Sequence, residues 1–433
     1  MASFPQSRLT AAIAGALRPA IAWLSRRRRL PLVREVLSHW LRERSTVRQG
    51  LLALTIGIGI TLVAGVILGA MDGLLEELPG LLVLAPAAIG MRGAIFGALG
   101  ARLGTGMLTG QIQGEFSRDS FLGQNTEAAG ILSLVTAVLL AAVAKGLTGV
   151  LGLEVIAFTD LVIVSVIGAV LSSLVVMGVV IALTRSAERF RWDMDAIGTP
   201  IISASADIST LPALIVGTFA IGNAVVSAIL GWVMVLAAAV ATVYGLRRSL
   251  DLARRVIQES LPVLLFTAVM GVLAGTVLEA RKETLISSAA LLVAVPPFIA
   301  SSGAIGGILS ARLSSQLHLG LVEPKAFPGR PAWLEGSLTV LFAVLGYLAV
   351  GGLTHLAAAL LGYGSPGLLP MIGIVFIAGM LAVMLIFLVG YYAATASFHF
   401  GLDPDNVSIP LVTSTMDFVG ILCLVVGILT VGA

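Results

Sequence analysis

Apolar segments long enough to cross a lipid bilayer follow one another along most of the chain. They fall near residues 50–70, 81–108, 129–150, 160–183, 199–220, 224–245, 257–278, 287–316, 335–361, 368–394 and 407–431. A transmembrane helix needs about 20 such residues. At 58% hydrophobic residues, the chain carries more apolar surface than a water-soluble fold can bury. The sequence therefore predicts an all-α polytopic membrane protein with about 11 spans.

The distribution of Lys and Arg predicts how this protein lies in the membrane. With a cytoplasmic N-terminus, twenty basic residues fall on the cytoplasmic side and only Arg281 and Lys282 fall outside. Basic residues are concentrated in cytoplasmic loops. We therefore expect a multi-pass protein of the cell membrane with a cytoplasmic N-terminus and an outside C-terminus.

Residues 1–48 are expected to form a basic cytoplasmic segment. Its "RRRR" cluster at 26–29 follows the first apolar stretch, whereas a secretory signal has its basic residues first. Within it, residues 31–48 have one apolar face that includes Leu37 and Trp40. This pattern is typical of an amphipathic helix, which either lies on the membrane surface or packs on the helix bundle.

An internal repeat with an offset of 210 residues predicts the architecture. The offset relates Pro86 to Pro296, Gly93 to Gly303, residues 101–103 to 311–313, Pro200 to Pro410 and Asp207 to Asp417. We predict a first five-helix repeat at 49–221, a linking transmembrane helix within 222–255 and a second five-helix repeat at 256–433. Because the linking span restores the direction of the chain, the repeats should be parallel and related by an axis along the membrane normal.

Asp207 and Asp417 are the strongest candidates for functional residues. Each lies 12 residues beyond another aspartate, Asp195 or Asp405, which is about 18 Å along a helix. That depth is near the membrane midplane, where a carboxylate is costly and usually functional. Two parallel repeats would bring both to a shared axis. The alternative is that each pairs with a buried Arg or Lys.

Two acidic pairs precede these residues at the cytoplasmic start of the fifth helix of each repeat. They are Asp193 with Asp195, and Asp403 with Asp405. One aspartate of each pair is explained as a helix cap that also suits the helix dipole. The second carboxylate is not explained by capping, and it favours a mouth that attracts cations.

The second helix of each repeat is rich in glycine and proline, as in "APAAIGMRGAIFGALGARLGTG" (85–106). Glycine allows helices to approach closely, and a broken helix can also expose carbonyl groups to a pore. Arg102 and Arg312 lie near the cytoplasmic ends of these helices, where their side chains are expected to extend toward solvent.

At these residues the sequence resembles the MgtE-like magnesium transporters, specifically the duplicated kind known as solute carrier family 41. The run from Asp403 to Asp417 is similar to that family's fifth-helix motif, and residues 296–314 are similar to its second-helix motif. The resemblance implies a cation pathway along the twofold axis, lined by the second and fifth helices of both repeats. It also implies central metal-site carboxylates at Asp207 and Asp417, and a cytoplasmic mouth of Asp193, Asp195, Asp403, Asp405 and Asn406.

The sequence departs from the family pattern at four positions. Met194 and Ala196 stand where the first fifth-helix motif would have Pro and Asn. Ala94 and Ala304 stand where the second helices would each have Asn.

The leading hypothesis is transport of a divalent cation, with Mg²⁺ as the transported ion and no other cofactor. Mg²⁺ takes oxygen ligands and gives up its waters reluctantly, which suits sparse carboxylates, although Mn²⁺ or Co²⁺ fit nearly as well. The expected partners are the cation and the lipid bilayer, not nucleic acid, and one chain could act as a pseudo-dimer.

Two other functions stay open from the sequence. A permease for an organic or anionic solute would need cationic or aromatic pocket residues in both repeats, and none is evident. An intramembrane aspartyl protease also needs two membrane aspartates, and "LPAL" at 211–214 is similar to an element of that class. The glycine-flanked aspartate of that class is missing, so we expect a protein that is not an enzyme.

Overall fold

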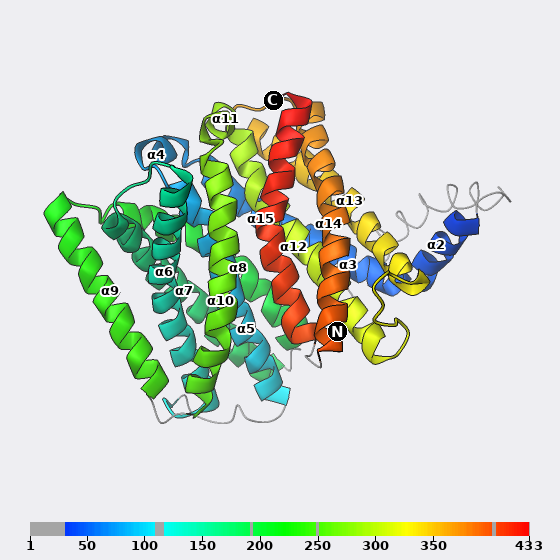
Figure 1. Cartoon of the computed structure of the whole chain (residues 1–433), viewed down its shortest axis with the longest axis horizontal. Helices are drawn as coiled ribbons and strands as arrows, with labels where there is room; N and C mark the ends of the chain where they lie inside the picture. Colours follow the sequence, from blue (N-terminus) through cyan, green and yellow to red (C-terminus); the bar gives the residue numbers. More distant parts are fainter. Residues whose placement is uncertain (1–30, 109–116, 191–193, 248–250, 401–403, 433) are drawn as a thin grey trace.

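The computed structural model describes residues 31–108, 117–190, 194–247, 251–400 and 404–432 of the 433-residue chain, and the regular elements in these ranges are all helices (Figure 1). Within them, 10 helices are long and apolar enough to cross a membrane. The predicted class of all-α polytopic membrane protein is confirmed.

Each repeat contributes five long helices. The first repeat consists of α3 (Arg44–Gly69), α5 (Leu81–Leu108), α6 (Phe121–Leu151), α7 (Phe158–Phe190) and α8 (Met194–Thr218). The second repeat consists of α10 (Asp251–Glu279), α12 (Ala289–His318), α13 (Arg330–Leu361), α14 (Leu368–His399) and α15 (Pro404–Val431). The linking helix is α9 (Ala224–Arg247). Ten of these eleven helices are the candidate spans above, and α8 is a 25-residue helix outside that set.

The repeats run in the same direction. Two short helices, α4 (Asp72–Glu77) and α11 (Lys282–Ser287), follow the first long helix of each repeat and begin and end at equivalent residues. Both lie on the same face of the bundle, where the C-terminus also lies (Figure 1). We call this the α4–α11 face and the other end of the bundle the opposite face. The second helices start at the α4–α11 face, and the fifth helices start at the opposite face.

The first helices are exchanged between the repeats, which the sequence did not predict. Helix α3 packs on α12 and α13 of the second repeat, and α10 packs on α5 and α6 of the first. A Cβ on Gly65 would overlap the carbonyl oxygen of Val293, and one on Gly275 would overlap the carbonyl oxygen of Val83. These two contacts are equivalent under the 210-residue offset. Glycine is needed at both because the helix backbones touch there.

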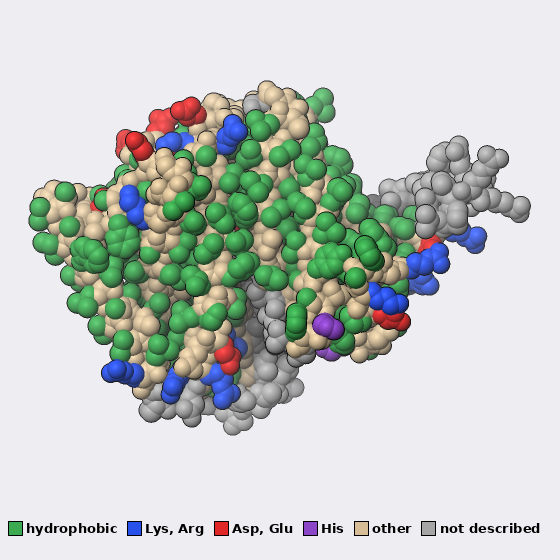
Figure 2. Space-filling model, in the orientation of Figure 1, with side chains coloured by type: hydrophobic (Ala, Val, Ile, Leu, Met, Phe, Trp, Pro, Cys, Tyr) green, Lys and Arg blue, Asp and Glu red, His purple; other side chains and the backbone are tan. Residues whose placement is uncertain are grey.

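Helix α9 lies at the edge of the bundle beside α6 and α7 (Figure 1). Its large apolar side chains point outward, and Trp232 and Leu236 are both more than half exposed. Figure 2 shows apolar side chains over the middle of the molecule and charged ones near its upper and lower edges. A bilayer would cover this middle band, because lipid chains solvate apolar side chains as well as the protein interior does.

The amphipathic segment forms a separate helix, α2 (Pro31–Arg42), and α3 begins immediately after it. Helix α2 packs on α13. The indole Nε1 of Trp40 donates a hydrogen bond to the Ser337 hydroxyl at 3.0 Å. Of the two arrangements that the sequence left open, the structure therefore contains the helix packed on the bundle.

Candidate functional site

The fifth helices, α8 and α15, begin at equivalent residues, Met194 and Pro404. Asp193 and Asp403, which precede them directly, lie outside the described residues. Asp195, Asp405 and Asn406 lie in the first turns, where the structure describes the backbone alone. The predicted acidic mouth therefore stays a prediction, and the described backbone of Asp195, Asp405 and Asn406 lies at the opposite face.

Asp207 of α8 and Asp417 of α15 occupy equivalent positions inside the bundle. Both side chains are partly exposed, and they lie close enough for the charge of one to act on the other. Among the described residues, no Lys or Arg forms an ion pair with either carboxylate, so the alternative of a buried basic partner is not found there. The shared ion site that the sequence predicts for these two residues stays a prediction.

The carboxylate of Asp417 crosses toward the first repeat. A Cβ on Gly90 of α5 would lie 3.2 Å from its Oδ2. A larger residue at this position would crowd the carboxylate. One helical turn from Asp417, the Ser414 hydroxyl forms a 2.9 Å hydrogen bond with the Thr267 hydroxyl of α10. The region around Asp417 is therefore built by α5, α10 and α15, which come from both repeats.

The second helices carry small residues that border open space. Ala94 of α5 is partly exposed and Ala304 of α12 is exposed. A Cβ on Gly97 would meet nothing within 4 Å. Because these helices are otherwise among the most buried of the candidate spans, the exposed small residues mark faces that do not pack against another helix.

The two second helices differ at Arg92, whose equivalent is Ser302. Arg92 is 2% exposed, and its guanidinium donates to the Ser173 hydroxyl at 3.0 Å and to the Ser133 carbonyl at 3.3 Å. Ser302 forms a 2.8 Å hydrogen bond with the Tyr347 hydroxyl. The partners of Arg92 lie on α6 and α7, and none of these hydrogen bonds reaches Asp207 on α8.

Arg102 and Arg312 do not simply extend to solvent as expected. The Nε of Arg102 donates to Asn125 Oδ1 at 2.8 Å. Arg312 forms an ion pair with Glu335, which is 2% exposed. Asn125 and Glu335 are equivalent residues of α6 and α13, so one position carries an amide in the first repeat and a carboxylate in the second. Sequence reasoning missed this pair, although the offset relates both residues.

The α4–α11 face contains a cavity of about 450 Å³ between the two short helices. Its lining includes the carboxylates of Glu76 and Glu283 and the ammonium group of Lys282. Lys282 is 3.2 Å from the carboxylate of Glu279. Since that pairing offsets the positive charge, the lining is acidic on balance.

Comparison with known proteins places the chain in a family. The family model described as MgtE, divalent cation transporter, matches residues 85–217 and again residues 295–427. The two matches start and end at equivalent residues and together cover more than half of the chain. This chain belongs to the MgtE family. The duplication seen in the sequence thus includes the region that the family model matches.

Curated relatives of this MgtE-family chain include solute carrier family 41 member 3 from two rodents. The Rattus norvegicus protein is 24% identical over 384 residues, which are 84% of this chain and 82% of the relative. The Mus musculus protein is 24% identical over 363 residues, which are 80% of this chain and 74% of the relative. No solved structure matched the chain. The predicted resemblance to the duplicated solute carrier family 41 type is confirmed.

Proposed function

We propose that this protein carries Mg²⁺ across the membrane along a pathway between its two repeats. Membership of a family of divalent cation transporters supports the substrate class. The observation that supports the proposal is that Asp207 and Asp417, one from each repeat, lie inside an apolar bundle where the charge of one acts on the other. Two carboxylates held near one another attract a divalent cation, because neither has another positive partner among the described residues.

The ligand chemistry favours an ion that keeps part of its water shell. In the described part of the chain, no group of three or more His, Cys, Asp and Glu side chains gathers to hold a metal. An ion between Asp207 and Asp417 would therefore complete its coordination with water or backbone carbonyl oxygens. Mg²⁺ usually retains several waters and binds through one or two carboxylates. Thiolate or imidazole ligands, which favour softer metals, are not needed.

The second and fifth helices of both repeats would line the proposed pathway. Helices α5 and α12 would contribute the accessible small residues Ala94, Gly97 and Ala304. Helices α8 and α15 would contribute the central carboxylates. The first turns with Asp195, Asp405 and Asn406, together with the preceding Asp193 and Asp403, would form the mouth at the opposite face. The cavity between α4 and α11 would form the other mouth.

The opposite face would be cytoplasmic, because most Lys and Arg residues of the sequence are expected there. The C-terminus, on the α4–α11 face, would then lie outside the cell membrane. Since one chain supplies both repeats, a single copy would suffice for one pathway.

The test is ion flux into proteoliposomes that contain the purified protein. External Mg²⁺ should enter vesicles loaded with a magnesium-sensitive dye, and empty vesicles should show no uptake. Repeating the assay with opposing Na⁺ or H⁺ gradients distinguishes an exchanger from a passive pathway. Absence of uptake of any divalent cation by folded protein would contradict the proposal.

A further inference from the structure

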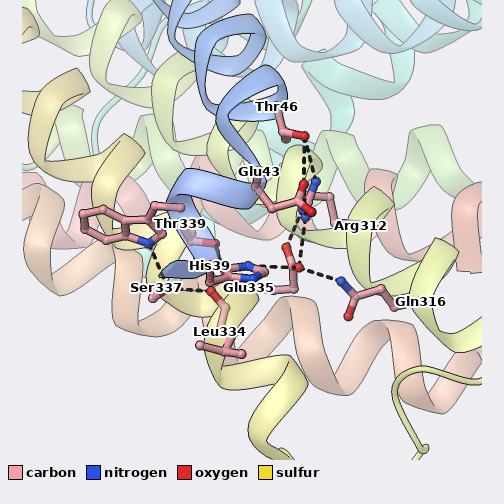
Figure 3. Close-up of polar contacts among 10 residues, drawn as sticks. His39, Glu43, Thr46, Arg312, Gln316, Leu334, Glu335, Ser337 and Thr339 are labelled. Atoms are coloured by element: carbon pink, nitrogen blue, oxygen red, sulfur yellow. Dashed lines mark hydrogen bonds and ion pairs between the residues drawn. The ribbon is translucent and has the colours of Figure 1, made fainter. Parts of the chain in front are cut away.

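A partly buried polar cluster joins α12 and α13 of the second repeat to the junction of α2 and α3 at the opposite face. We call it the α12 clamp, and it consists of Glu43, Thr46, Arg312, Gln316 and Glu335 (Figure 3). Arg312 donates from Nη2 to Glu335 Oε1 at 2.9 Å and to Glu43 Oε2 at 3.1 Å. Its Nη1 donates to the Thr46 hydroxyl at 3.3 Å. Gln316 also donates to Glu335.

The clamp joins four elements around one guanidinium group. Arg312 and Gln316 lie on α12, Glu335 lies on α13, and Glu43 and Thr46 lie where α2 meets α3. Partial burial disfavours ionisation of Glu43, but hydrogen bonds from Thr46 and Arg312 and the charge of Arg312 outweigh it. The pKa of Glu43 is therefore below its ordinary value of 4.5. Glu43 is ionised at neutral pH, and its bonds to Arg312 are charge-assisted, which makes them stronger than neutral hydrogen bonds.

The first repeat lacks this clamp at the equivalent positions. Arg102 has the amide of Asn125 in place of a carboxylate. The equivalents of Glu43 and Thr46 are Ala253 and Val256, which are buried in an apolar cluster. The charge of Glu259 on α10 acts on Arg102 at longer range, but Glu259 is exposed, so water weakens its attraction.

We propose that the two repeats move unequally during transport: the α12 clamp fixes α12 to its neighbours, and α5 moves at the opposite face. Glu43, Arg312 and Glu335 are then positioning residues, which do not touch the ion but hold one wall of the pathway. Helix α5 can move more easily because the hydrogen bond that Arg102 makes among the described residues goes to a neutral amide. The part of this proposal that concerns transport rests on the proposed function.

A negative charge added beside Arg102 tests whether α5 moves during transport. Asn125→Asp keeps the size of the side chain and creates an ion pair with Arg102. Because the charge-assisted bond would hold α5 to α6, the maximal rate of Mg²⁺ uptake should fall about fivefold. The Mg²⁺ concentration for half-maximal uptake should stay within about twofold of that of the unmodified protein. Thr126→Asp adds the same charge one residue along α6, away from Arg102, and should keep the rate of the unmodified protein.

Spin-label distances test whether α12 is fixed to α13, and this measurement needs no transport assay. Replacing Cys423, the single cysteine of the chain, by Ala allows labels at equivalent pairs, Ala98→Cys with Gly130→Cys and Ile308→Cys with Val340→Cys. The pair on α5 and α6 should show a broad distance distribution, and the pair on α12 and α13 a narrow one.

Weakening the clamp should broaden the narrow distribution. Glu335→Gln removes the buried charge and keeps the shape of the side chain. Glu43→Gln is the milder variant, because this side chain is partly exposed, and it should broaden the distribution even if Glu335→Gln does not fold. Equal widths in the two repeats of the unmodified protein, or an unchanged rate in Asn125→Asp, would overturn the inference. Failure of the proposed function would instead appear as absence of uptake in the unmodified protein, with the spin-label result unaffected.

Discussion

The exchange of the first helices makes a quantitative prediction about Gly275. Its neighbour is the backbone of α5, and an added Cβ would overlap the Val83 carbonyl oxygen and lie 2.6 Å from Val83 Cα. Backbone atoms cannot move aside by a change of rotamer, so α10 would have to shift away from α5. We expect Gly275→Ala to cost at least the upper part of the usual overpacking range, about 3 kcal/mol. Gly65→Ala should behave alike, because its Cβ would overlap the Val293 carbonyl oxygen.

The matched control is Gly59→Ala on α3, where an added Cβ would meet nothing within 4 Å. Alanine is the better helix former by about 1 kcal/mol, so this variant should be as stable as the unmodified protein or slightly more so. The assay is thermal unfolding of detergent-purified variants, followed by loss of the monodisperse peak in size-exclusion chromatography. If Gly275→Ala and Gly65→Ala unfold at the same temperature as Gly59→Ala, the helices do not touch as described.

Two further predictions concern selectivity and topology. Alanine at positions 94 and 304 offers no side-chain oxygen to the waters of a hydrated ion, so Mn²⁺ or Co²⁺ should compete with Mg²⁺ for uptake. Ala94→Asn with Ala304→Asn should shift preference toward Mg²⁺, and unchanged competition would show that these positions do not face the ion. Reporter fusions at the two ends of the chain should report different compartments. The same compartment for both would contradict an odd number of spans and the parallel repeats.

The sequence predicted the features that follow from hydropathy and from the repeat. Long apolar runs predict spans because a bilayer requires helices with satisfied backbones. The offset between Asp207 and Asp417 predicts a shared site, because equivalent residues of parallel repeats face a common axis, and this part stays a prediction. Both arguments use only this sequence and the physical properties of the lipid bilayer.

The sequence did not predict which helices pack against one another. The offset is the same whether α3 packs on its own repeat or on the other, so periodicity cannot distinguish the two arrangements. A glycine predicts a close contact between helices but does not indicate which helix makes it. The contact of Gly65 with Val293 is known only from the structure. The 210-residue offset did not predict the α12 clamp, because the residues equivalent to Glu335 and Glu43 are Asn125 and Ala253, which carry no charge. A comparison of unlike residues at equivalent positions would have found Asn125 and Glu335.

The most direct test of the account is Mg²⁺ uptake by the central aspartate variants. Asp207→Asn and Asp417→Asn keep the shape of each side chain and remove its charge, and Asp119→Asn, an exposed aspartate, is the control. Uptake in proteoliposomes should fall strongly in each central variant and disappear in the double variant, while all variants reach the membrane in normal amount. Near-normal Mg²⁺ uptake by the double variant would contradict the central claim that the two carboxylates form a shared ion site.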